Sequence, residues 1–451
     1  MAANKIDLRN QSIIRLFFTY FIPSVCAMLA LSTNATIDGI FVGQMVGADA
    51  LAAVGIAWPL FPVMIAYELL FSIGGASLSS YHIGKGKPQR ARMIFSSIFY
   101  FALLSGSIIG VILFLFRYEM ARLLGASAVL EPLVVEYIGV IFLGGIFIVL
   151  QPMLDIFAIN DKRPNLAMFA TIAASLLNII LNYIFIFLWG WGLFGAALAT
   201  VLGNAIGFFV LLRHFVLRQG EIYFLRYFNM RACLVSAKNG IPQSVAEISA
   251  SLMILAFNHA LREIAGERGI AIYSILMYTG IVVFTVILSS AQSIQPIASF
   301  NYGAGCTQRI RSVFSFGLVF SLLLGIVMYG LSSVFAPLLV SIFVGEAEIL
   351  NDPMLAADVA HAIGIYYLGF VLLGMSLCSA ILLQSIQRPW HALLVTLSSS
   401  LLFAIPLVFT LPKFWGIDGV WWSYPCAMVA SSVIACCVIL YEFKKGALRL
   451  S

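Results

Sequence analysis

The chain has 451 residues, of which 62% are hydrophobic and only 10% are charged. Soluble domains carry about 25% charged residues, so this composition excludes a water-soluble enzyme. It also excludes a disordered chain, because disorder requires low hydrophobicity. The net charge of +6 alone would suit nucleic acid, but the basic residues lie between long apolar runs. The composition therefore indicates a polytopic membrane protein.

Twelve apolar runs are long enough to cross a bilayer, which takes about 20 residues. We expect these spans near 14–43, 50–82, 93–116, 133–159, 165–188, 194–213, 240–261, 269–300, 312–342, 357–385, 391–411 and 419–442. An even number of spans places both termini on the same side of the membrane. Outer-membrane barrels would show short alternating segments instead. The predicted fold class is therefore an all-α integral membrane protein.

The distribution of Lys and Arg predicts the orientation, since these residues concentrate in cytoplasmic loops. Most of the 25 bases fall on the side that holds both termini. The opposite side holds only Arg117, Arg122, Arg262, Arg268 and Lys413. Both termini are therefore predicted to be cytoplasmic. The bases mark topology and the contact with the lipid bilayer, so we expect no nucleic-acid partner.

The two halves of the chain repeat each other. Residues 82–96 read HIGKGKPQRARMIFS and residues 301–315 read NYGAGCTQRIRSVFS, and Pro23 matches Pro242 in the same register. Six spans separate equivalent points, so equivalent helices run in the same direction, as in transporters with parallel repeats. The matching prolines suggest hinges in their helices. The repeat predicts an N-terminal six-helix lobe, a cytoplasmic connector and a C-terminal six-helix lobe at 1–213, 214–239 and 240–451.

Several motifs resemble those of the multidrug and toxic compound extrusion (MATE) transporters, closest to the prokaryotic DinF-type members. They lie at 38–43 (DGIFVG), 51–53 (LAA), 84–86, 178–182, 192–197 (GLFGAA) and 295–303 (QPIASFNYG). The resemblance covers nearly the whole chain. It implies two six-helix lobes that form a V in a bacterial inner membrane, and the repeat itself predicts alternating access by rocking of one half on the other. The resemblance also implies export of cationic amphipathic compounds in exchange for protons or sodium ions.

Four acidic residues lie well inside the predicted spans, with no Lys or Arg at a comparable depth. They are Asp38, Glu68, Asp155 and Glu247. A charged side chain at the centre of a span costs roughly 2.5–3.5 kcal/mol on insertion scales. Such residues are functional-site hypotheses by default, and the alternative is a protonated structural acid that is hydrogen-bonded.

Asp38 is the strongest candidate for ion coupling. Asn34 precedes it by four residues, and Asn178 and Asn182 are also four apart, so each pair shares a helix face. Carboxylate and amide oxygens are ligands for a hard cation, which predicts a sodium site at Asp38 and Asn178 or a proton site. In the MATE resemblance Asp38 falls on the coupling acid, with Asn178 and Thr200 in its cluster. DinF-type members commonly have Asp where this chain has Asn182, which weakens the case for tight sodium binding.

Two further carboxylates belong to polar stripes. Asp155 follows Gln151 by four residues, and Glu247 follows Gln243 by four. We predict that Asp155 and Gln151 contribute to substrate binding, and that Asp155 also supports ion coupling in place of the missing charge. Glu247 and Gln243 are predicted to bind the cationic substrate, with a second proton site at Glu247 as the alternative.

Aromatic residues make up 13% of the chain, and cation–π contacts would suit organic cations. We assign substrate contact to Tyr137, Tyr273 and Tyr278, against the alternative that they face lipid or pack the core.

Other signals argue against ATP, cofactors and catalysis. The G-x-G-x-x-G match at 190–195 joins two spans, and the chain has no phosphate-binding G-x-x-x-x-G-K-[ST] loop. The cysteines form no C-x-x-C pair, and four of the five histidines lie near span ends, where we interpret them as solvated or interfacial. We expect a monomer with no cofactor beyond the coupling ion. A flippase of a lipid-linked amphiphile is the alternative function, although it would need a basic cavity.

Overall fold

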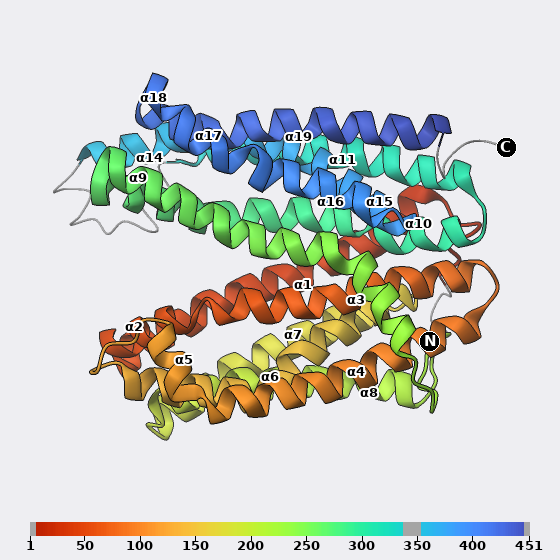
Figure 1. Cartoon of the computed structure of the whole chain (residues 1–451), viewed down its shortest axis with the longest axis horizontal. Coiled ribbons are helices and arrows are strands. Elements are labelled where there is room, and N and C mark those ends of the chain that lie inside the picture. Colours follow the sequence, from red (N-terminus) through yellow and green to blue (C-terminus); the bar gives the residue numbers. More distant parts are fainter. Residues whose placement is uncertain (1–5, 337–352, 446–451) are drawn as a thin grey trace. The chain divides into compact units, whose positions relative to one another are not determined.

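The computed structural model describes residues 6–336 and 353–445, and helices dominate both ranges (Figure 1). The helices of the first half are α1 (Ile13–Phe41), η1 (Val42–Val46), α2 (Ala48–Ala57), α3 (Leu60–Gly84), α4 (Pro88–Leu115), α5 (Arg117–Leu123), α6 (Glu131–Asn160), α7 (Pro164–Asn182), η2 (Tyr183–Leu188) and α8 (Gly192–Val216). Those of the second half are α9 (Met230–Gln292), α10 (Ile294–Gly303), α11 (Thr307–Val334), α14 (Pro353–Tyr366), α15 (Leu368–Ser385), α16 (Pro389–Leu397), η3 (Ser398–Leu402), α17 (Ala404–Thr410), α18 (Pro412–Trp415) and α19 (Ile417–Lys445).

Eleven helical stretches in the described ranges are long and apolar enough to cross a membrane. One of them, Met230–Gly303, has 74 residues, which at 1.5 Å per residue is about 110 Å. The hydrocarbon core of a bilayer is only about 30 Å thick. Gly266, with φ of 61°, breaks the helical path inside this stretch, so it contains two spans. The prediction of twelve spans is confirmed, and only positions 337–342 of the predicted span 312–342 lie outside the described residues.

The chain packs as two compact units. The first unit contains Ile22–Ser244, and the second contains Asp7–Phe21 together with Val245–Ser451. Two helices are therefore divided between the units: α1 after Phe21 and α9 after Ser244. Both divisions fall within three residues of the repeat-related prolines, Pro23 and Pro242. The lobes at 1–213 and 240–451 follow from the repeat rather than from packing, and they stay a prediction.

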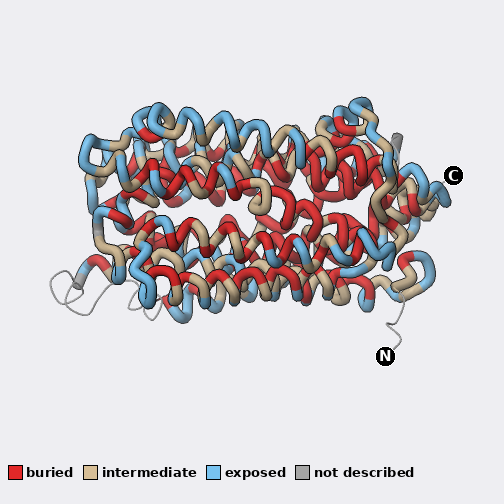
Figure 2. The backbone as a smooth tube through the Cα atoms, turned by 90° about the horizontal axis from the view of Figure 1, so that it is seen from below, coloured by how far each residue is buried: buried red, intermediate tan, exposed pale blue. Residues whose placement is uncertain are grey.

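Small residues bring the helices of the first unit into close contact. A Cβ atom at Gly203 of α8 would lie 2.8 Å from the carbonyl oxygen of Ala174 on α7. A Cβ atom at Gly110 of α4 would lie 2.5 Å from the carbonyl oxygen of Phe142 on α6. Such backbone contacts are typical of membrane helices, where lipid gives no hydrophobic drive to associate. Buried, intermediate and exposed residues alternate along the helices of the protein (Figure 2).

A buried carboxylate holds the connector after α8 against the turn between α6 and α7. Asp161, between α6 and α7, contacts His214 Nε2 at 2.8 Å through its Oδ2 atom. Its Oδ1 atom accepts the backbone N–H groups of Glu221 at 2.8 Å and Ile222 at 3.0 Å. Burial raises the pKa of Asp161, and the His214 contact opposes that rise. The His214 side chain is only 2% exposed, so of the two interpretations, solvated or interfacial, the solvated one does not hold for this histidine.

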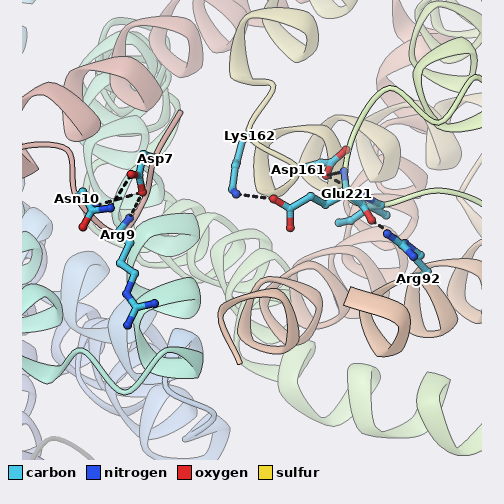
Figure 3. A network of polar contacts seen from close by, with 8 residues as sticks. Asp7, Arg9, Asn10, Arg92, Asp161, Lys162 and Glu221 are labelled. Atoms are coloured by element: carbon cyan, nitrogen blue, oxygen red, sulfur yellow. Dashed lines mark hydrogen bonds and ion pairs between the residues drawn. The ribbon is translucent and has the colours of Figure 1, made fainter. Parts of the chain in front are cut away.

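Two further contacts secure the same connector (Figure 3). Lys162 Nζ pairs with Glu221 Oε1 at 2.6 Å, and Arg92 Nε of α4 donates to the carbonyl oxygen of Glu221 at 2.9 Å. Glu221 thus binds groups from two elements through its side chain and its backbone.

The second unit contains a similar pair of a buried acid with basic residues, but the acid and the histidine have exchanged positions. Glu442 of α19 has a side chain that is 1% exposed, and it pairs with His391 Nδ1 at 2.8 Å and Arg388 Nε at 3.5 Å. Here the acid lies on α19, and the bases lie just before α16 and in its first turn. In the first unit the acid lies at the turn before α7 and the histidine lies on α8.

Candidate functional site

Asp38 and Asn182 lie next to two irregular helix turns of the first unit. α1 changes to the π-helix η1 four residues after Asp38, and α7 ends at Asn182, where the π-helix η2 begins. The two π-helices pack against each other. Single π turns in membrane and soluble helices occur frequently at functional sites. The sequence pattern did not predict them.

A chain of hydrogen bonds connects three helices at this point. Asn182 Nδ2 donates to Asp38 Oδ1 at 2.5 Å and to Asn178 Oδ1 at 3.1 Å. Asn178 Nδ2 donates to Thr200 Oγ1 of α8 at 3.2 Å. We call these four residues the Asp38 cluster. The structure therefore brings together four of the residues predicted for ion coupling, which come from three separate helices.

The Asp38 cluster contains oxygen atoms suited to a small cation. The Oδ1 atom of Asn182 is buried and has no hydrogen-bond partner, and the same holds for Oδ1 of Asn34. Both atoms belong to the described part of the chain. Asn34 lies one turn from Asp38 on α1, but its side chain is not hydrogen-bonded to that carboxylate. A carboxylate with amide and hydroxyl oxygens nearby can accept a proton or coordinate a hard cation.

Asp155 forms a second, separate cluster in the first unit. Gln151 of α6 and Thr171 of α7 both donate to Asp155 Oδ2, the latter at 2.8 Å. The other carboxylate oxygen, Oδ1, is buried without a hydrogen-bond partner. Thr171 precedes Asn182 by eleven residues, which is about 16 Å along α7. The two clusters thus lie on one face of α7 at different depths.

The sequence alone did not identify Thr171 as a site residue. The signal that could have found it is its spacing from Asn178 and Asn182, seven and eleven residues away, which keeps all three side chains on one helix face.

The predicted substrate residues differ in exposure. Gln243 and Glu247 are both half-buried on α9. Tyr137 is buried on α6. Tyr273 is only 1% exposed and packs in the core of the second unit. Tyr278 is 64% exposed.

The fold and the motifs agree with one family model, MatE, which matches residues 23–184 and 242–410. The chain belongs to this family. Members of the MatE family are transporters and not enzymes, as the sequence predicted.

Relatives of this MatE-family chain span nearly its full length. It is 22% identical over 437 residues to the multidrug export protein MepA of Staphylococcus haemolyticus, covering 95% of this chain and 94% of that one. It is 23% identical over 450 residues to the probable multidrug resistance protein YoeA of Bacillus subtilis, covering 97% and 95%.

Solved structures confirm the fold of this MatE-family chain. An outward-facing multidrug resistance MATE family transporter of the MOP superfamily aligns with a TM-score of 0.91 and 22% identity, covering 99% of both chains. A MOP superfamily transporter from Pyrococcus furiosus, described as having a binding pocket of reversed polarity that suggests a different function, aligns with a TM-score of 0.90 and 22% identity over 100% of both chains. The all-α, two-lobe membrane fold is therefore confirmed.

Proposed function

We propose that this transporter exports cationic amphipathic compounds across a bacterial plasma membrane in exchange for protons or sodium ions. The observation that carries the proposal is the contact of Asn182 Nδ2 with Asp38 Oδ1 at 2.5 Å, within a buried cluster of amide and hydroxyl groups. Relatives from Staphylococcus and Bacillus that match 95% and 97% of the chain are named for multidrug export or resistance. We place both termini in the cytoplasm and expect a monomer that uses no ATP.

Asp38 is the coupling carboxylate in this proposal. Its partner in the cluster is a neutral amide, and among the described residues no Lys or Arg forms an ion pair with it. A carboxylate inside a membrane is costly when it is charged. A bound proton or sodium ion removes that cost, so ion occupancy can change the stability of a transporter state. One charge moving inward across 100 mV supplies about 2.3 kcal/mol.

Coupling requires more than binding. An ion that bound both states of the transporter equally would shift no equilibrium. We propose that alternating access changes the exposure of the Asp38 cluster, so that the ion binds more tightly in the state that has released its substrate outward. The π-helical turns η1 and η2, which adjoin Asp38 and Asn182, support this role because they are irregular points in their helices.

Glu247 is the proposed partner of the cationic part of the substrate, with Gln243 one turn before it. Its half-buried position on α9 leaves part of the side chain accessible. Tyr278, with 64% of its surface exposed, is the tyrosine best placed for a cation–π contact. The burial of Asp155, and its two donors from Gln151 and Thr171, favour ion coupling over substrate contact for that residue.

Transport into everted membrane vesicles tests the coupling. An acid-inside gradient or a high-sodium-inside gradient is imposed separately, and uptake of a fluorescent organic cation is followed. We expect one of the two gradients to drive uptake, and the Asp38→Asn variant to lose it while still reaching the membrane. The matched control is Asp49→Asn, because Asp49 is an exposed aspartate on α2. Undiminished gradient-driven uptake by the Asp38→Asn variant would contradict the proposal.

A further inference from the structure

The first unit contains an open cavity that the coupling mechanism does not use. Its volume is about 690 Å³, and its walls come from α4, α5, α6 and the start of α8. Three of its lining residues, Tyr118, Leu143 and Phe194, are 47%, 53% and 40% exposed. In a membrane-spanning protein, we expect exposed apolar side chains of this kind to face lipid.

The cavity is polar at one end and apolar at the other. Glu131 and Glu136 line it near the start of α6, whereas Val140 and Leu143 line it farther along the same helix. The distance along α6 from Glu131 to Leu143 is about 18 Å. The cavity therefore suits a ligand that carries a charged group at one end and a long apolar part at the other.

Arg117 supplies a fixed cation at the polar end. Its Nη1 atom donates to the carbonyl oxygen of Phe114 at 2.9 Å, and its guanidinium lies 4.4 Å and 5.0 Å from the ring centres of Phe114 and Tyr118. A Cβ atom at Gly139 would lie 3.4 Å from Arg117 Cδ, so glycine at that position leaves room for the arginine. A guanidinium has five N–H donors in a planar fork that matches phosphate.

Two carboxylates lie at the same end. Glu136 is exposed, and its Oε1 accepts the backbone N–H of Phe194 at 3.2 Å. Glu131 pairs with Arg122 at 3.0 Å, and this pair connects α5 to α6. The cavity therefore presents one cation and one anion, Arg117 and Glu136, beside an ion pair that is already neutral.

This end of the unit also has the composition of a membrane–water boundary. α5 follows directly after the span that ends at Leu115. Trp189 and Trp191 are exposed here, and the Trp191 ring lies 6.0 Å from the Phe194 ring. Tryptophan is enriched at the level of lipid headgroups. The charged end of the cavity thus lies where headgroups lie.

We propose that this cavity binds a phospholipid whose headgroup carries both a phosphate and a primary ammonium group, as in phosphatidylethanolamine. Arg117 binds the phosphate, Glu136 accepts hydrogen bonds from the ammonium, and an acyl chain follows α6 past Val140 and Leu143. Under the proposed topology the lipid belongs to the outer leaflet.

Charge complementarity distinguishes this lipid from the alternatives. An anionic phospholipid would leave Glu136 facing its negative headgroup, and a cationic drug would face Arg117. A choline headgroup cannot donate hydrogen bonds to Glu136, and the rings of Phe114 and Tyr118 are already covered by the Arg117 guanidinium.

Native mass spectrometry of the purified full-length protein tests the proposal. Phosphatidylethanolamine, phosphatidylcholine and phosphatidylglycerol with identical acyl chains compete for the protein. We expect phosphatidylethanolamine to bind about tenfold more tightly than phosphatidylcholine, the effect of one hydrogen bond to a charged group. Glu136→Gln should remove that preference, and Arg117→Gln should weaken binding of all three lipids. Leu143→Trp, which fills the apolar end, should also weaken all three.

The matched controls are Glu263→Gln and Arg262→Gln, which remove exposed charges of the same type from α9 and should leave the preference intact. Equal binding of phosphatidylethanolamine and phosphatidylcholine would overturn the proposal. So would tighter binding of phosphatidylglycerol that Glu136→Gln does not change, or lipid binding that Leu143→Trp leaves untouched. The measurement involves no transport, so its outcome is independent of the proposed export function.

Discussion

Asn182 donates one amide hydrogen bond to Asp38 and a second to Asn178, at 2.5 Å and 3.1 Å. Both donors come from the same Nδ2 atom, so the amide oxygen of Asn182 points elsewhere and has no hydrogen-bond partner. The residue at position 182 therefore determines how much negative charge stands beside Asp38. With asparagine there, Asp38 is the one ionisable member of the cluster.

A second carboxylate at this position should change the ion preference. In an Asn182→Asp variant two carboxylates would be in direct contact, and like charges at such a distance cannot both ionise unless a cation lies between them. We expect sodium-stimulated uptake to appear, or to increase, in vesicles at neutral pH. Asn258→Asp, at a half-buried asparagine of α9, is the control for an added charge. A variant that transports with the same sodium response as the parent would contradict the assignment of the cluster.

Removing the charge of Asp155 should reduce ion-driven uptake less than removing the charge of Asp38. Asp155→Asn keeps the size of the side chain and removes its charge, while Asp38 remains in place. We expect ion-driven uptake to fall severalfold without being abolished. Thr171→Val removes a donor to Asp155 and should lower uptake in the same direction. Initial rates of uptake at several gradient sizes measure this, and full activity in both variants would reduce Asp155 to a structural role.

The contacts of Asp161 with His214 and with the backbone N–H groups of the connector should contribute strongly to the stability of the protein. Asp161→Ala leaves a buried histidine and two backbone N–H groups without their acceptor. Removing one partner of a buried pair typically costs about 3–5 kcal/mol, so we expect a large drop in the unfolding temperature of the detergent-purified protein. Glu221→Gln is the matched control, since its pair with Lys162 is far more solvent-exposed than the Asp161–His214 pair and should contribute much less, about 0–1 kcal/mol for a surface pair. Similar melting of the two variants would show that the connector is held by other contacts.

Two glycines in the first unit should tolerate no side chain. A Cβ atom at Gly74 of α3 would lie 1.9 Å from the carbonyl oxygen of Ser236, and one at Gly240 would lie 2.0 Å from that of Leu70. Both glycines allow α3 and the start of α9 to approach backbone to backbone. We expect Gly74→Ala and Gly240→Ala to lower the unfolding temperature and the yield of folded protein. Gly330→Ala, where a Cβ meets nothing within 4 Å, should be neutral or slightly stabilising.

The architecture could be predicted from the sequence because membrane spans leave a strong signal. A span needs an apolar run of a minimum length. The matching residues of segments 82–96 and 301–315 revealed the repeat. The break at Gly266 also falls between two predicted spans. None of this required knowledge of side-chain contacts.

The candidate site was only partly predictable, for a physical reason. Spacing along one helix shows which residues share a face, which is how Asn178 and Asn182 were paired. It does not show which helix that face meets, so the partner of Asp155 on α7, Thr171, was not identified. His214 was misinterpreted for the same reason, because its position near a span end gives no indication that Asp161 covers it.

The division of α1 and α9 between the two compact units has a consequence for the integrity of the polypeptide. A cut in the connector would produce two fragments, and the first would carry away Asp7–Phe21, which packs with the second unit. The second fragment would carry Met230–Ser244, which packs with the first unit. Each half of the chain thus completes the other, as strands exchanged between partners do in a domain-swapped dimer. We therefore expect that neither fragment folds alone and that only their joint synthesis restores the protein.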